Sequence, residues 1–144
     1  MKYKFYGSEN GEVFPVCKDF LKVKNQFDLY ELLSEIWCEY TCAPRLRDKW
    51  NKNNKTVGQC SITAFLVQDI FGGEVYGVLL NDGAFHCYNI VGGVKFDLTS
   101  EQFSYALEYK DVYPQSREKH FSSKEKYERY NYLKAELLKV LNKR

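Results

Sequence analysis

Three side chains that can cooperate in nucleophilic chemistry follow one another between Gly58 and Phe103. Cys60 precedes an apolar run typical of a helix, and His86 and Asp97 lie on two short runs typical of paired strands. A thiol reacts as its thiolate, and the unpaired amides and dipole of a helix N-terminus favour that negative charge. A histidine can move the protons, and a carboxylate can orient the imidazole. The order predicts a site with Cys60 as nucleophile, His86 as base and then acid, and Asp97 as orienting group.

The turn between the two strands decides whether His86 and Asp97 meet. A two-residue turn at Gly92-Gly93 makes them diagonal neighbours, and a turn at Val91-Gly92 makes them direct partners. Both registers place the two side chains on one face of the sheet, whereas a three-residue turn places them on opposite faces. The predicted site therefore depends on a tight turn at Gly92.

Polar groups near Cys60 are candidates for substrate binding. The free amide of Cys60 can face the oxygen of a tetrahedral intermediate, and Gly58 lets a carbonyl substrate approach the backbone. Gln59, Asn89 and Trp50 are candidate substrate-binding or oxyanion groups.

Each member of the site also has a structural interpretation. Cys60 can be a core thiol, His86 a hydrogen-bonded strand histidine, and Asp97 a cap for a helical turn that begins at Thr99. The alternative function is a binding or interaction protein without activity, whose basic C-terminal helix and exposed aromatic side chains contact a partner.

A metal site is a third hypothesis. Cys38 and Cys42 are spaced like one pair of zinc ligands, and Cys87 or His120 could be further ligands. Structural zinc sites have four protein ligands, however, and the sequence has only one such cysteine pair. The glycine pairs indicate turns rather than a phosphate loop. We therefore expect no metal and no cofactor.

Hydrophobic periodicity predicts an α+β fold in a single domain, residues 1–144, with a helix on a small antiparallel meander. Residues 1–22 hold a hairpin (2–16) or an arm, and a helix begins at Asp28 as cap and ends at Pro44. We expect a polar, substrate-facing loop over 45–57. The remaining elements are a helix from Cys60 to Ile70 or Phe71, strands at 74–80, 84–90 and 94–98, a turn at 99–103, an irregular stretch at 108–121 and a helix over 123–142.

Composition favours a protein that stays in the cytoplasm. The 144 residues are 44% hydrophobic and 17% aromatic with a net charge of +2, and no apolar run has the length of a signal or a membrane span. Five cysteines without framework-like spacing fit reduced thiols. Basic residues gather in 110–144, but their alternation with acids favours a solvated helix face over nucleic-acid binding.

The motif blocks resemble those of transglutaminase-like and papain-like cysteine enzymes, in which Cys, His and Asp follow in this order. More closely, the chain is similar to the YunG-like family of small bacterial proteins. This similarity rests on Trp50, Asn54, Gly58-Gln59-Cys60, Thr63-Ala64, Gln68-Asp69, Gly72-Gly73-Glu74, His86, Tyr88-Asn89, Asp97-Leu98-Thr99, Gln102-Phe103, Arg129-Tyr130 and Leu133-Lys134.

The resemblance implies a papain-like or transglutaminase-like core and acyl transfer: hydrolysis of an amide or ester, deamidation, or crosslinking through an acyl-enzyme. The substrate would be a peptide, a protein or a small amide. The short intervals from Cys60 to His86 and from His86 to Asp97 lead us to expect little room for an elaborate cleft.

Overall fold

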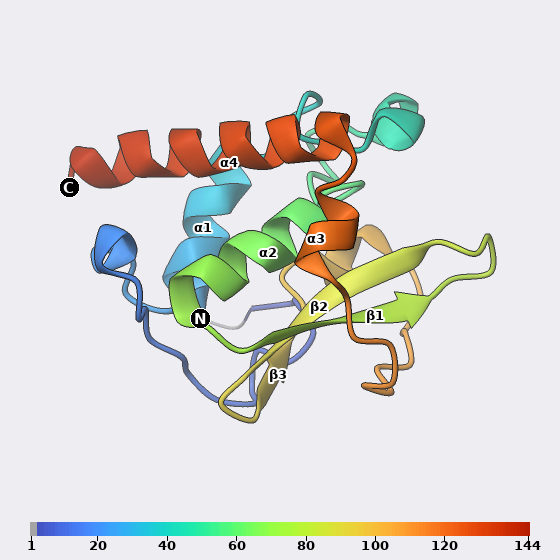
Figure 1. Cartoon of the computed structure of the whole chain (residues 1–144), viewed down its shortest axis with the longest axis horizontal. Helices are drawn as coiled ribbons and strands as arrows, with labels where there is room; N and C mark the ends of the chain where they lie inside the picture. The colour runs from blue at the N-terminus through green and yellow to red at the C-terminus, as the bar shows by residue number, and fades with distance from the viewer. Residues whose placement is uncertain (1–2) are drawn as a thin grey trace.

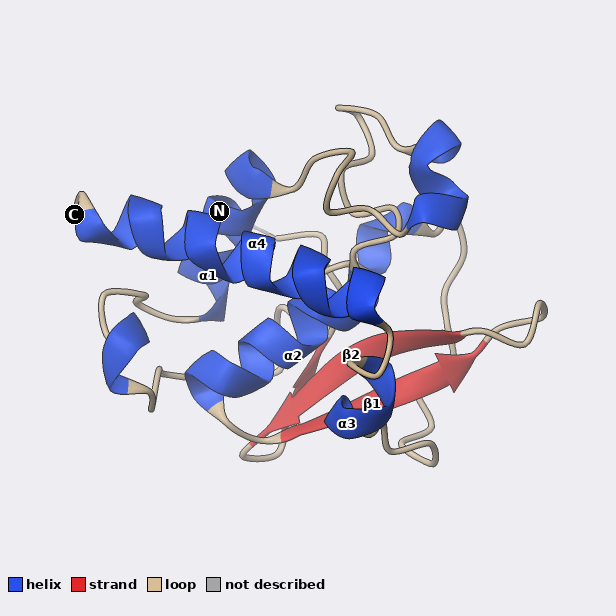
Figure 2. Cartoon of the chain, turned by 45° about the horizontal axis from the view of Figure 1, so that its top comes forward, coloured by secondary structure: helices blue, strands red, loops and turns tan. Residues whose placement is uncertain are grey.

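A central helix, α2 (Cys60–Phe71), organises the chain in the computed structural model, which describes residues 3–144. The long helix α4 (Lys124–Asn142) packs on one side of α2, and the sheet packs on the other (Figure 1). α1 (Gln26–Ile36) also contacts α4. Short helices complete the structure: α3 (Arg117–His120) and the 3₁₀ helices η1 (Lys18–Phe20), η2 (Pro44–Lys49) and η3 (Ser100–Gln102). The predicted α+β class is confirmed (Figure 2).

α2 is buried on nearly every side because its sequence is apolar almost throughout. Its inward-facing side chains run from Ile62 to Val67 and continue at Ile70 and Phe71. Gly72 ends the helix with φ 82°, and its N–H donates to the Gln68 carbonyl. Glycine adopts this left-handed conformation without a steric cost, so the predicted end of the helix is confirmed.

The sheet has the strand order β1-β2-β3, with β1 Glu74–Leu79, β2 Phe85–Val91 and β3 Val94–Phe96. Val91 pairs with Val94, so Gly92 and Gly93 alone form the turn, with φ 54° and 83°. Such a turn fits the twist of a hairpin. β3 is shorter than predicted, because Asp97 leaves the β2 ladder and bridges Tyr6 instead.

The predicted N-terminal hairpin is wrong for the described part of residues 2–16; Lys2 lies outside it. Residues 3–16 contain no strand and bond to other segments. Val13 N–H donates to Gln26 Oε1 at 2.9 Å, and Val16 N–H donates to the Ile70 carbonyl at 2.8 Å. The alternation of aromatic and polar residues reflects an arm that packs across the domain.

α1 begins earlier and ends much earlier than predicted. Asn25, not Asp28, is the cap: its side chain accepts the Asp28 N–H at 2.9 Å, and the Asp28 carboxylate pairs with Arg144. The helix ends at Ile36 rather than at Pro44, because Trp37 adopts extended backbone and its indole N–H donates to Thr63 Oγ1 at 3.0 Å.

The C-terminal third is more ordered than the sequence suggested. α3 forms within the stretch predicted to be irregular, capped by Ser116, which accepts the Lys119 N–H. Ser123 caps α4, whose inner face buries Tyr130, Leu133, Leu137 and Leu141 as predicted, while Tyr127 is exposed. No helix within residues 3–144 is long and apolar enough to cross a membrane.

Candidate active site

Cys60 is the first residue of α2, as the sequence predicted, and its side chain is half-buried at the edge of a cavity. The amides of the first helical turn have no carbonyl partner within the helix, so they favour a negative charge at Cys60. In the observed register, Cys87 directs its backbone groups toward the β3 side. Because β3 stops at Phe96, the Cys87 amide is left facing Cys60.

The Cys60 thiol is strongly acidified. Hydrogen bonding by the Cys87 side chain is the largest cause, and it holds the pKa of Cys60 well below its usual range although burial opposes the shift. The charge and hydrogen bond of His86 and the Cys87 amide lower this pKa further. The neighbouring Cys60 and burial raise the pKa of the Cys87 thiol, which favours its protonated form. Cys60 is therefore the thiolate of the pair.

His86 and Asp97 meet on one face of the sheet, as the tight turn requires. His86 Nε2 lies 2.6 Å from Asp97 Oδ2, and both side chains are 1% exposed. Burial by itself lowers the pKa of His86, but the charges of Asp97 and Cys60 outweigh it and raise this pKa to about 10. Since Asp97 occupies Nε2, the nitrogen left for Cys60 is Nδ1. The three groups form a thiolate, an imidazolium and a carboxylate in sequence.

Two residues that the sequence did not single out as partners hold the Asp97 carboxylate. Tyr109 Oη donates to Oδ2 at 2.7 Å, while the Thr99 amide and hydroxyl donate to Oδ1 at 3.1 and 3.2 Å. Thr99 occupies the N-cap position of η3, but its side chain makes no cap hydrogen bond there. Tyr109 comes from a stretch without periodicity, so no local pattern points to it. The adjacent Asp97-x-Thr99 spacing is a signal, because a carboxylate commonly accepts the amide two residues on.

Gly58 lines the cavity, and its missing side chain also makes room for a neighbouring segment. Its φ is 70°, and a Cβ there would lie 2.5 Å from Cys42 Sγ and 2.9 Å from the Ala43 nitrogen. The Gly58 carbonyl accepts the Ala43 N–H at 2.9 Å. The missing side chain therefore makes room for the segment that precedes η2, and this packing positions the loop before Cys60.

The three supporting residues proposed from the sequence do not point into the cavity. Gln59 is fully buried and donates to the Cys38 carbonyl at 3.2 Å, while its Oε1 has no partner among the described residues. Asn89 is buried and donates to the Ala64 carbonyl at 2.9 Å, which ties β2 to α2. Trp50 donates to the Lys55 carbonyl at 3.0 Å. All three side chains stabilise the backbone around the site.

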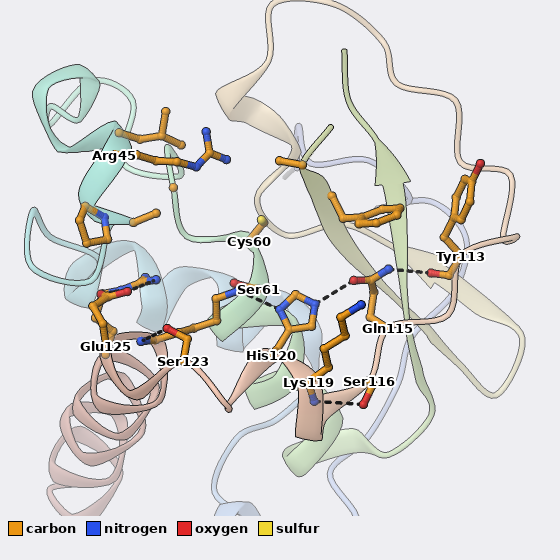
Figure 3. A pocket seen from close by; sticks show the side chains of 18 of the residues that line it. Arg45, Cys60, Ser61, Tyr113, Gln115, Ser116, Lys119, His120, Ser123 and Glu125 are labelled. Carbon is orange, nitrogen blue, oxygen red and sulfur yellow. Dashed lines mark hydrogen bonds and ion pairs between the residues drawn. The ribbon is translucent and has the colours of Figure 1, made fainter. Parts of the chain in front are cut away.

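A cavity of about 890 Å³ opens beside Cys60, contrary to the expectation of little room (Figure 3). Most of its wall comes from outside the Cys60–Asp97 segment, which is why the short intervals did not predict it. Besides the start of α2, the lining comes from residues 43–46, 84–85 and 112–116, from Gly58 and Gln102, and from α3 and the start of α4 with its cap. The loop expected to face the substrate contributes Arg45 and Leu46 but not Trp50.

His120 forms a second polar centre in this cavity, which sequence reasoning considered only as a metal ligand. Its Nε2 contacts Gln115 Oε1 at 2.8 Å, and its Nδ1 contacts Lys126 Nζ at 2.9 Å (Figure 3). Burial and then the Lys126 charge lower the pKa of His120 to about 4. The imidazole is therefore neutral near pH 7, with Nδ1 as acceptor.

Residues 3–144 contain no group of three or more His, Cys, Asp or Glu side chains that could hold a metal ion. The hypothesis on Cys38 and Cys42 therefore lacks further ligands in that part of the chain. The five cysteines are free thiols.

Comparison with known proteins places the chain in a family. Residues 25–142 match the family model described as YunG protein. The chain is 33% identical over 111 residues to "Uncharacterized protein YunG" of Bacillus subtilis (strain 168), covering 77% of this chain and 90% of that protein. No solved structure matches significantly. The chain belongs to the YunG family.

Proposed function

We propose that this YunG-family protein is a cysteine-dependent acyl-transfer enzyme, acting as an amide hydrolase, a deamidase or a transglutaminase-like enzyme on a papain-like core. The observation that carries the proposal is the linked trio at the start of α2. An acidified Cys60 thiol contacts His86, whose Nε2 is 2.6 Å from Asp97 Oδ2. A buried charge-linked trio that opens on a cavity is the arrangement a thiol nucleophile needs.

The first half-reaction forms an acyl-enzyme. The Cys60 thiolate attacks the carbonyl carbon of an amide, forming a C–S bond and moving the C=O electron pair onto oxygen. The free Cys60 amide in the first turn of α2 is the candidate oxyanion donor. The oxyanion then collapses, the C–N bond breaks, and His86 Nδ1–H gives its proton to the departing amine.

The second half-reaction regenerates the thiolate. Neutral His86 takes a proton from water or from an acceptor amine as that nucleophile attacks the thioester carbonyl. Collapse breaks the C–S bond, so Cys60 leaves as thiolate beside an imidazolium that Asp97 stabilises. Water as acceptor gives hydrolysis or deamidation, and an amine gives crosslinking.

Alkylation of the thiols tests this proposal. Iodoacetamide should label Cys60 at pH 6 far faster than Cys17 and Cys38, which are also half-buried. Site-resolved mass spectrometry measures each rate against pH. His86→Ala should remove the fast low-pH reaction. A Cys60 rate equal to the reference thiols and unchanged in His86→Ala would support the alternative, a binding protein that uses the same cavity.

A trapped intermediate gives a second test. An activated ester should leave its acyl group on Cys60, detected as a mass increase on the peptide that contains it. Cys60→Ala should abolish the adduct, whereas Cys17→Ala should leave it intact. Failure to acylate a demonstrably reactive Cys60 would argue against acyl transfer.

A further inference from the structure

We propose that the substrate is a small amide or ester bearing a carboxylate, and that Lys126 and Lys119 bind this carboxylate while Cys60 attacks the carbonyl. This inference rests on the proposed function and names its substrate class. Its basis is the charge balance of the cavity, which the chemistry of the trio does not require.

Positive charge predominates in the cavity lining. Arg45, Lys119, Lys126 and Arg129 face a single acid, Glu125. Glu125 is already paired with Arg129, which is 2% exposed and also donates to the Thr41 carbonyl. Arg45 forms a solvent-exposed ion pair with Asp82 at 3.5 Å. The two lysines therefore carry the charge that the cavity leaves unbalanced.

Lys126 is fixed in place without a counterion. Its Nζ contacts His120 Nδ1 at 2.9 Å, and no carboxylate of residues 3–144 lies within ion-pair distance of it. His120 is neutral and is fixed in turn by Gln115. A partly buried ammonium without a counterion costs free energy. An anionic group of a ligand would supply the missing partner.

The cavity's size and apolar wall narrow the substrate further. About 890 Å³ lies within the range of roughly 300–1,000 Å³ that suits small molecules. Phe85, Val112, Tyr113 and Pro114 line the same cavity as Cys60 and His120. Tyr113 lies on the far side of Gln115 from Cys60 in Figure 3. We therefore expect a small molecule with one carboxylate and an apolar portion.

Two alkylating probes of nearly equal shape test the charge preference. Iodoacetate is anionic and iodoacetamide is neutral, so their rate ratio at Cys60 reports the field that an incoming carboxylate meets. Lys126→Met should lower this ratio roughly fivefold or more. Lys124→Met is the matched control, because Lys124 begins the same helix but does not line the cavity. An unchanged ratio in Lys126→Met overturns the inference.

A binding measurement separates this inference from the proposed function. Succinate, but not neutral succinamide, should shift the His120 imidazole resonances in the intact protein, and Lys126→Met should abolish the shift. A reactive Cys60 without charge preference or succinate binding overturns the carboxylate site and leaves acyl transfer standing. An unreactive Cys60 with succinate binding overturns acyl transfer and supports the carboxylate site.

Discussion

His120 lines the cavity and His86 lies buried behind Cys60 in its lining, and the neighbours of the two histidines shift their pKa values in opposite directions. His86 lies against Asp97 and has its pKa raised to about 10, whereas His120 lies against Lys126 and has its pKa lowered to about 4. Burial disfavours the imidazolium in both places. At His86 the negative charges of Asp97 and Cys60 outweigh burial, and no such charge outweighs it at His120. The comparison shows that burial favours the neutral imidazole at both positions, and that adjacent negative charge reverses this at His86 whereas the Lys126 charge reinforces it at His120.

The largest effect should follow from removing the carboxylate beside His86. Asp97→Asn keeps the shape but removes the charge, so the pKa of His86 should fall and Cys60 should lose its cationic partner. We expect the iodoacetamide rate at pH 7 to drop on the order of a hundredfold. Asp111→Asn is the control, because Asp111 pairs with Lys95 outside the trio. An unchanged Cys60 alkylation rate in Asp97→Asn would show that the Asp97 charge does not cause the reactivity of Cys60.

The opposite partner should make His120 a source of acid sensitivity. The pKa of His120 is about 4 in the folded protein and near 6.5 in the unfolded chain. Between these pH values His120 is neutral when folded and protonated when unfolded. The unfolded state binds more protons between these values, so stability falls as pH drops through this window. After allowance for partial exposure, we expect a loss on the order of 1–3 kcal/mol.

Urea unfolding at pH 7 and pH 4.5 measures this loss, and His120→Gln should lose correspondingly less stability on acidification. Equal losses in the two proteins would show that His120 is protonated in the folded state.

Removing the cation beside His120 should have a smaller effect. In Lys126→Met the pKa of His120 should rise from about 4 but stay below 6.5, because burial is the larger cause and remains. NMR titration of the imidazole protons reads this value, with Lys124→Met as control. A pKa of 6.5 or above would mean that burial contributes little.

Loosening Asp97 without removing it should have the smallest effect. Tyr109→Phe deletes one hydrogen bond at 2.7 Å, while His86 and Thr99 still hold the carboxylate. We expect the Cys60 alkylation rate to fall at most about fivefold, as for one hydrogen bond of about 1 kcal/mol. A fall as large as that of Asp97→Asn would make Tyr109 an essential positioning residue.

Local sequence signals predicted the elements that carry Cys60 and His86. The apolar run and Gly72 defined α2, and the Gly92-Gly93 turn set the register that brings His86 to Asp97. These features depend on neighbours a few residues apart. They could therefore be read from spacing.

The surroundings of the site depend on distant segments and could not be read this way. Tyr109 reaches Asp97 from an irregular stretch, and Lys126 reaches His120 from α4. Gln59 and Asn89 were misassigned because polar side chains near a nucleophile can equally bond to buried carbonyls, as both do here. Tertiary packing decides which partner such a polar side chain bonds to, and it leaves no periodic pattern in the sequence.

The N-terminal arm links the site's order to local opening of the chain. Tyr6 accepts the Asp97 N–H at 2.9 Å, donates its own N–H to the Ser100 hydroxyl at 2.8 Å, and stacks on Tyr109 with ring centroids 3.8 Å apart. The arm precedes the matched family region, residues 25–142. Detaching it exposes the Asp97 amide while α2 stays folded, so deuterium should enter this amide sooner than the interior of α2. The free energy of detaching the arm sets the fraction of time for which the Asp97 backbone is held in place.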